Sequence, residues 1–137
     1  MIEIRRLLQK RFSREVVAVK PSEASVTSAD AAFLERVRVA VEAHMANGNF
    51  GAAWLADEVG LSERQLRRKL KELTNLSTAG YIRSMRLQRA AQLLEEQAGT
   101  VSEVAYAVGF QDPKHFSRLF RQVFGVSPSR IHALNGT

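Results

Sequence analysis

The sequence predicts an all-α fold of about seven helices, in which two helix-turn-helix units are joined by one long helix. Apolar residues recur at spacings of three and four in segment after segment, and no segment of the main domain alternates with period two over a strand length. In addition, "VGLSERQLRRKLKELTNLST" at 59–78 is matched in pattern by "VGFQDPKHFSRLFRQVFGVSP" at 108–128. This repeat predicts the same local structure twice.

The first 29 residues differ from the rest of the chain. In "MIEIRRLLQKRF" at 1–12 the apolar side chains are spaced as in an amphipathic helix, whereas "SREVVAVKPSEASVTS" loses this periodicity and favours an extended linker. Two interpretations of the first segment stay open: a frayed basic arm, or a helix that docks on a neighbour or pairs two chains. We therefore predict an appendage at 1–29 and a main domain at 30–137.

The main domain is expected to open with a helix capped by Asp30, which the loop formers "NGN" at 47–49 end. A short helix over 52–59 follows. Trp54 lies on its apolar side, so packing is favoured for this indole over the alternative of base stacking. Gly60 then fits the left-handed position at which helices commonly end.

A third and a fourth helix follow this glycine. Ser62 and Gln65 have the spacing of a capping box at the start of the third helix. Its apolar stripe consists of Leu66, Leu70 and Leu73. The fourth helix is a long amphipathic one over 77–97, and Gly99 is expected to end it.

The second half of the main domain repeats this order. Capping-box spacing at Thr100 and Glu103 opens a short helix through Val108, and Gly109 is expected to repeat the role of Gly60. The alternating glycine turns and short helices indicate a second helix-turn-helix unit. We place the two units at about 51–73 and 100–124.

The sixth helix begins with Asp112 as N-cap and Pro113 in the first turn, where the missing N–H is not needed. Its predicted inner stripe is Phe116, Leu119, Phe120 and Val123. Ser127 and Pro128 repeat this pattern of cap and proline for a short final helix. Asn75 and Gly125 occupy equivalent closing turns, and both residue types tolerate a left-handed backbone.

Positive charge is concentrated on the two copies of the repeat. The chain carries a formal net charge of +6, and residues 61–89 hold eight Lys and Arg residues against two acids, while 114–130 hold four and no acid. A basic balance favours polyanionic partners. The second helix of a helix-turn-helix can enter the major groove of DNA, with its apolar side held down and its opposite side carrying donors. Double-stranded DNA is the predicted partner.

The predicted joining helix sets the separation of the two units. It has roughly 19 residues and is therefore about 28 Å long at 1.5 Å per residue. Successive major-groove faces on one side of B-DNA lie about 34 Å apart. A rod of this length with one reading helix at each end fits two successive grooves.

Residues 30–132 resemble the DNA-binding domain of AraC/XylS-type transcription regulators. The resemblance is carried by "LADEVGLSERQLRRKLKELTNLS", by "YIRSMRLQRAAQLL" and, most specifically, by "VSEVAYAVGFQDPKHFSRLFRQVFGVSP". It implies a homeodomain-like fold, sequence-specific DNA binding and transcriptional control. Ile131 and His132 depart from the usual Tyr-Arg after the final Ser-Pro, which bears on the packing of the last helix and on any phosphate contact there. Leu70 replaces a common phenylalanine.

The resemblance implies that Arg64, Arg67, Arg68, Lys114, His115, Ser117 and Arg118 bind DNA, and the outward sides of the same two helices add Lys71 and Arg121. The candidate DNA-binding residues are Arg64, Arg67, Arg68 and Lys71 in the first unit, and Lys114, His115, Ser117, Arg118 and Arg121 in the second. Reading a base and holding a phosphate stay open for Arg64, Arg67 and Arg118, as do DNA contact and plain exposure for His115. Arg86, Arg89 and Arg121 are expected to contact phosphate or solvent, and pairing with nearby acids is a further option for Arg86.

A second resemblance concerns the appendage. The basic "IRRLLQKRF" and the extended stretch after it resemble the end of a receiver domain and the linker that follows. This implies that the chain is the output domain of a two-component response regulator or hybrid sensor, with the receiver aspartate outside it. RNA polymerase and a second copy, paired through the N-terminal segment or through missing domains, are further candidate partners.

Other classes of protein find little support in the sequence. The chain has no cysteine, three scattered histidines and no recognisable catalytic or phosphate-binding motif, so we predict no enzyme activity, no metal and no cofactor. No apolar run approaches a membrane span, and no signal peptide is recognised, so a cytoplasmic location without membrane contact is expected. Two alternative functions stay open: a non-specific architectural DNA binder and a protein-interaction module.

Overall fold

The computed structural model describes residues 27–135, and these residues form helices without strands, so the all-α prediction is confirmed. The seven helices are α2 (Ser28–His44), α3 (Ala52–Val59), α4 (Glu63–Thr74), α5 (Thr78–Glu95), α6 (Val101–Ala107), α7 (Pro113–Phe124) and α8 (Pro128–Asn135). The predicted amphipathic helix at 1–12, and most of the predicted linker, lie outside the described residues.

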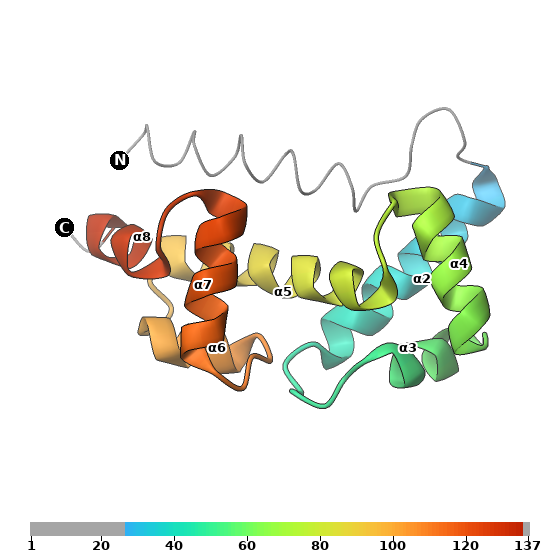
Figure 1. The fold of residues 1–137 in the computed structure, drawn as a ribbon, viewed down its shortest axis with the longest axis horizontal. Helices are drawn as coiled ribbons and strands as arrows, with labels where there is room; N and C mark the ends of the chain where they lie inside the picture. Colours follow the sequence, from blue (N-terminus) through green and yellow to red (C-terminus); the bar gives the residue numbers. More distant parts are fainter. Residues whose placement is uncertain (1–26, 136–137) are drawn as a thin grey trace.

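Helix α5 runs along the length of the molecule and joins its two halves (Figure 1). Helices α2, α3 and α4 pack at one end of it, and α6, α7 and α8 pack at the other. Helices α4 and α7, the second helices of the two helix-turn-helix units, both run across the direction of α5 near its opposite ends. This is the predicted arrangement of two units on one connecting helix.

The buried apolar side chains form two separate clusters, one in each half. The first cluster is built from α2, α3, α4 and the N-terminal part of α5, and includes Val37, Leu55, Leu66, Leu70 and Tyr81. The second is built from the C-terminal part of α5 with α6, α7 and α8, and includes Leu94, Phe116, Phe120, Phe124 and Ile131. Along α5 the change from one cluster to the other falls between Met85 and Leu87.

The turn chemistry read from the sequence is largely confirmed. Ser62 accepts a hydrogen bond from the N–H of Gln65, and the Gln65 side chain accepts one from the N–H of Ser62, which closes the predicted capping box. Thr100 and Glu103 do the same for α6, and these hydrogen bonds hold the pKa of Glu103 below its usual value. The two capping boxes satisfy amide groups that each helix start leaves without partners.

Helix α2 begins earlier than predicted. Its N-cap is Thr27, whose hydroxyl accepts the N–H of Asp30 at 3.1 Å, so Asp30 lies in the first turn. Both residue types cap helices, and the residues between them, Ser28 and Ala29, carry no apolar signal that fixes the boundary.

Helix α5 also ends earlier than predicted. The helix ends at Glu95 with Glu96 as its C-cap, and the left-handed residue is Gln97, with φ of 56°, rather than Gly99. In α7 the fully buried positions are Phe116, Phe120 and Phe124. Leu119 and Val123 are only partly buried, so the predicted stripe was placed too far to one side.

The departure from the family pattern at the chain's last helix does not disturb its packing. Ile131 is completely buried in the second cluster. The carbonyl of His132 accepts a hydrogen bond from the Gln97 side chain at 2.9 Å, which ties α8 to the turn after α5.

Ser62→Ala is expected to destabilise the first unit by about 1 kcal/mol, because it removes the hydroxyl that accepts the backbone N–H of Gln65. Chemical denaturation measures the change. Ser102→Ala, at an exposed serine inside α6, is the matched control and should leave stability nearly unchanged. Equal effects of the two substitutions would show that the capping box contributes nothing.

Candidate nucleic-acid interface

Helix α4 presents one apolar and one basic side. Leu66, Leu70 and Leu73 are buried against the first cluster, while the four candidate residues Arg64, Arg67, Arg68 and Lys71 are exposed. At 100° per residue, Arg64, Arg68 and Lys71 lie opposite the buried leucines and Arg67 lies at the edge of the exposed side. Lys71 also donates from Nζ to the carbonyl of Asn75 at 3.2 Å, so part of its capacity caps its own helix.

Helix α7 has the same division. Phe116, Phe120 and Phe124 are buried, and Lys114, His115, Arg118 and Arg121 are exposed. Lys114, Arg118 and Arg121 point away from the phenylalanines, whereas Ser117 lies at the edge and is partly buried. The residue that corresponds to Ser117 in α4 is Arg67, so the edge position of the two helices carries different donors.

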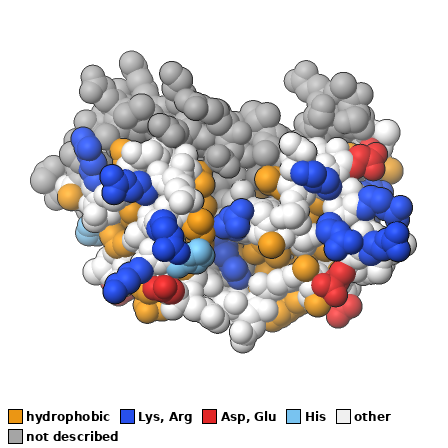
Figure 2. Space-filling view, viewed as in Figure 1, with side chains coloured by type: hydrophobic (Ala, Val, Ile, Leu, Met, Phe, Trp, Pro, Cys, Tyr) orange, Lys and Arg blue, Asp and Glu red, His pale blue; other side chains and the backbone are white. Residues whose placement is uncertain are grey.

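Both basic helices appear on one face of the molecule. Figure 2 shows lysine and arginine side chains gathered over α7 at one end and over α4 at the other, with further ones in the hollow between them. A hollow of about 510 Å³ is lined by residues of the turn between α6 and α7 together with Arg83 and Arg86. The face thus carries two positive clusters separated along α5.

The third residue of α4 and the third residue of α7 have different roles. Gln65 of α4 is held in the capping box, so its side-chain oxygen is committed to the helix start. The corresponding His115 of α7 is free of this task because Asp112 caps that helix through the N–H of Lys114. Arg118 instead lies 2.9 Å from Nδ1 of His115 through Nη2. The structure thus brings two candidate residues, His115 and Arg118, into direct contact.

Arg86, which was expected to contact phosphate or solvent, is partly buried, and within residues 27–135 its hydrogen bonds go to backbone carbonyls rather than to an acid. Its guanidinium donates from Nε to the carbonyl of Met45 at 3.1 Å, and from Nη2 to the carbonyls of Asn47 at 3.0 Å and Phe50 at 3.4 Å. Burial lowers the pKa of Arg86. The pattern of charges in the sequence could not predict this role, because the partners of Arg86 are backbone groups far away in the sequence. Arg89 is exposed and bonds the Gln92 side chain, as expected of a surface residue.

Trp54 packs rather than presenting its ring to a ligand. It is partly buried against the first cluster, its ring lies 4.9 Å from that of His44 and 5.3 Å from that of Phe50, and its Nε1 donates to Glu58 at 3.3 Å. His44 also lies 3.1 Å from the Glu58 carboxylate. These contacts place Trp54 in the wall of the first unit, as the sequence predicted.

Between residues 27 and 135, no group of three or more His, Asp or Glu side chains is arranged to hold a metal ion. Within that same part of the chain, none of the helices is long and apolar enough to cross a membrane.

The fold and the two exposed basic helices define a tandem helix-turn-helix domain. A family model described as a helix-turn-helix domain matches residues 55–133, which is more than half of the chain. A transcriptional regulator with an AraC-type DNA-binding domain from Chromobacterium violaceum has a similar structure, with a TM-score of 0.72 and 27% identity over 81% of this chain and 98% of that one. This chain belongs to the AraC-type helix-turn-helix family, whose members are DNA-binding domains of transcription regulators.

Two further relatives extend the comparison. The DNA-binding domain of AdpA, a global transcriptional factor solved in complex with a target DNA, matches with a TM-score of 0.66 and 30% identity over 74% of this chain and 90% of that one. Histidine kinase P4 of Formosa agariphila is 37% identical over 130 residues, which is 95% of this chain but 9% of the kinase. The chain spans between 9% and 28% of the length of the first curated relatives it matches.

Proposed function

We propose that this chain binds double-stranded DNA sequence-specifically, by inserting α4 and α7 into two successive major grooves, and so regulates transcription. The observation that carries the proposal is the pair of exposed basic helices on one face, held at opposite ends of α5. Helix α5 has 18 residues and is therefore about 27 Å long. That length is close to the distance of about 34 Å between successive major-groove faces.

The nine candidate residues divide by position. The residues opposite the buried stripes, such as Arg68 and Arg118, are placed to enter a groove first, while those at the edges, Arg67 and Ser117, are placed to meet one wall of it. Arginine bonds guanine O6 and N7 with two parallel donors, or a phosphate with the same geometry. His115 then acts through the Arg118 guanidinium, which it orients.

Selection of bound duplexes from a random pool, followed by sequencing, tests the proposal. Two enriched boxes about one helical turn apart are expected if both helices read bases. One enriched box would assign base reading to a single unit. No enrichment, with tight binding to every duplex, would favour a non-specific architectural binder, and no retention on any duplex at low salt would favour a protein-interaction module.

Arg67→Ala and Arg118→Ala are each expected to cost about 1–3 kcal/mol of binding free energy and to relax the preference at one base pair, if the residue is bidentate to guanine. Titration against the selected duplex and against duplexes changed at single base pairs measures both effects. Arg36→Ala, which removes an exposed arginine of α2, is the control for the loss of one charge. Equal losses on all duplexes would leave Arg67 or Arg118 with a phosphate role.

We further propose that the chain is the output domain of a two-component signalling protein. The support is its likeness to a histidine kinase, over a stretch longer than the described residues 27–135. In the longer protein, phosphorylation is expected to change the affinity for the selected duplex. Binding that is identical with and without phosphorylation, measured on that protein, would contradict this part of the proposal.

A further inference from the structure

The place where the two units meet along α5 is built from polar and backbone groups. The two apolar clusters are separate, so no shared core fixes one unit against the other. Arg86 lies on α5 between Met85, which belongs to the first cluster, and Leu87, which belongs to the second. The boundary between the units is therefore occupied by a guanidinium.

That guanidinium is seated on the loop that follows α2. It donates to three carbonyls, those of Met45, Asn47 and Phe50, at 3.1, 3.0 and 3.4 Å. A carbonyl at a helix end or in a turn needs such a partner, and the planar fork of arginine can serve several acceptors at once. The loop at 45–50 is thereby tied to the middle of α5.

The second unit contacts the Met45 carbonyl and the Arg86 guanidinium through Gly109. A Cβ at this position would come within 2.0 Å of the Met45 carbonyl oxygen and 2.7 Å of Arg86 Nε, so the Gly109 backbone lies directly against the seated guanidinium. Gly60, at the corresponding turn of the first unit, has open space where a Cβ would point. A further close approach joins Gly48 of the first unit to the Gln111 side chain of the second.

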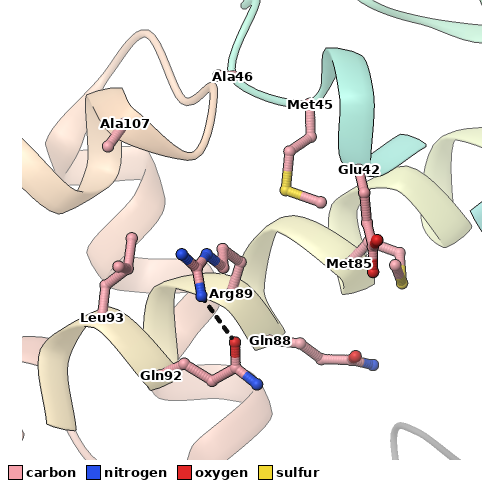
Figure 3. Close-up of a pocket in the computed structure, with 9 residues that line it drawn as sticks. All are labelled: Glu42, Met45, Ala46, Met85, Gln88, Arg89, Gln92, Leu93 and Ala107. Atoms are coloured by element: carbon pink, nitrogen blue, oxygen red, sulfur yellow. Dashed lines mark hydrogen bonds between the residues drawn. The ribbon is translucent and has the colours of Figure 1, made fainter. Parts of the chain in front are cut away.

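These contacts form a narrow bridge. On one side of it lies the hollow lined by Arg83 and Arg86, and another hollow, of about 620 Å³, lies between Met45 and Ala46 of the first unit and Ala107 of the second (Figure 3). Figure 3 shows Arg89 and Leu93 of α5 at the floor of this second hollow. Because the units are parted on both sides, their relative angle depends on α5 and on the few contacts at the bridge.

We propose that Arg86 and Gly109 form a clamp that fixes the angle between α4 and α7, which makes Arg86 a positioning residue for two-groove DNA binding rather than a contact to DNA. The clamp itself is inferred from the geometry alone. Its consequence for DNA binding rests on the proposed function. Held at a fixed angle, the second helix binds at a high effective concentration once the first is in its groove. The clamp thus also sets which spacing of two boxes is accepted.

Arg86→Lys separates the clamp from a phosphate contact, since lysine keeps the charge but lacks the planar fork that serves three carbonyls. Arg89→Lys, three residues further along α5 at an exposed arginine bonded to Gln92, is the matched control. The chain has no cysteine, so spin labels can be placed at Ala53→Cys and Ser102→Cys, which are exposed on α3 and α6. The distance distribution between the labels is measured without DNA, and affinity is measured on duplexes with one box, two boxes and two boxes moved by one base pair.

For Arg86→Lys we expect a broader distance distribution, affinity for the two-box duplex lowered about tenfold, unchanged affinity for one box, and a smaller loss when the boxes are moved. Arg89→Lys should change none of these. If Arg86→Lys has the same distance distribution and the same two-box affinity as the unaltered chain, the clamp is overturned. If it loses affinity for the one-box duplex while its distance distribution is unchanged, Arg86 is a DNA contact. If the parent binds no duplex, the proposed function fails, and the label distances alone decide the clamp.

Gly109→Ala and Gly60→Ala provide a second comparison. Both positions have positive φ, of 98° and 73°, so both substitutions carry backbone strain, but only the one at Gly109 meets the Met45 carbonyl. Gly109→Ala is expected to shift or broaden the label distances, and Gly60→Ala is not. Equal distances in the two variants would contradict the clamp. Complete unfolding of both Arg86→Lys and Gly109→Ala would assign these residues to stability and overturn the positioning role.

Discussion

Phe120→Ala is expected to lower the free energy of unfolding of the second unit by about 3–5 kcal/mol. Phe120 is completely buried, and its ring lies between those of Phe116 and Phe124, at centroid distances of 5.6 and 4.5 Å. Removal of the ring loses its burial and leaves a cavity that neighbouring helices fill only in part. Because the two apolar clusters are separate, the loss should be confined to the half that contains α6, α7 and α8.

Hydrogen exchange measured helix by helix checks this expectation. Protection should fall in α6, α7 and α8 and be retained in α2, α3 and α4, while α5 loses protection in its C-terminal part. Tyr106→Ala is the control, since this aromatic side chain is 54% exposed on α6. Equal loss of protection in both halves would show that the domain unfolds as one unit.

Affinity for the selected duplex is expected to fall about a thousandfold between about 50 and 200 mM salt. Six exposed cations lie on the sides of α4 and α7 that face away from the core: Arg64, Arg68, Lys71, Lys114, Arg118 and Arg121. If each neutralises one phosphate, counterion release gives a slope of about −5 for log affinity against log salt. Titrations at several salt concentrations measure the slope.

The slope also distinguishes the residues that hold phosphate. Arg121→Ala should make it shallower by about 1 on every duplex, whereas Arg36→Ala, on α2, should leave it unchanged. A slope near zero for the unaltered chain would exclude an interface dominated by phosphate contacts.

Most of the fold could be predicted because its signals are local. The capping boxes at Ser62 and Thr100 depend on residues three apart, and the left-handed positions of Asn75 and Gly125 depend on the residue itself. The errors arose at helix ends, where more than one nearby residue can take the terminal position. Thr27 and Asp30 both cap helices, and Gln97 takes a left-handed conformation that Gly99 would have accepted more easily.

The candidate site could be predicted only in part. Helical periodicity separates Arg118 from Phe120, and the structure places them on opposite sides of α7 as expected. The hydrogen bonds of Arg86 could not be predicted, because its acceptors are backbone carbonyls that tertiary packing brings near and that carry no sequence signature. Gly109 was predicted from its turn alone, while its approach to Met45 is a contact between units. DNA contact by the nine candidate residues stays a prediction.

The separation of the two cores also explains how the halves of the repeat have come to differ. At equivalent places, the first half has Leu66 and Leu70 where the second has Phe116 and Phe120, and each set is completely buried. A shared interior would require an increase in volume on one side to be matched by a decrease on the other. With two interiors, each half accommodates its own side chains. The buried side chains of the two copies can therefore differ while the helices keep the same arrangement.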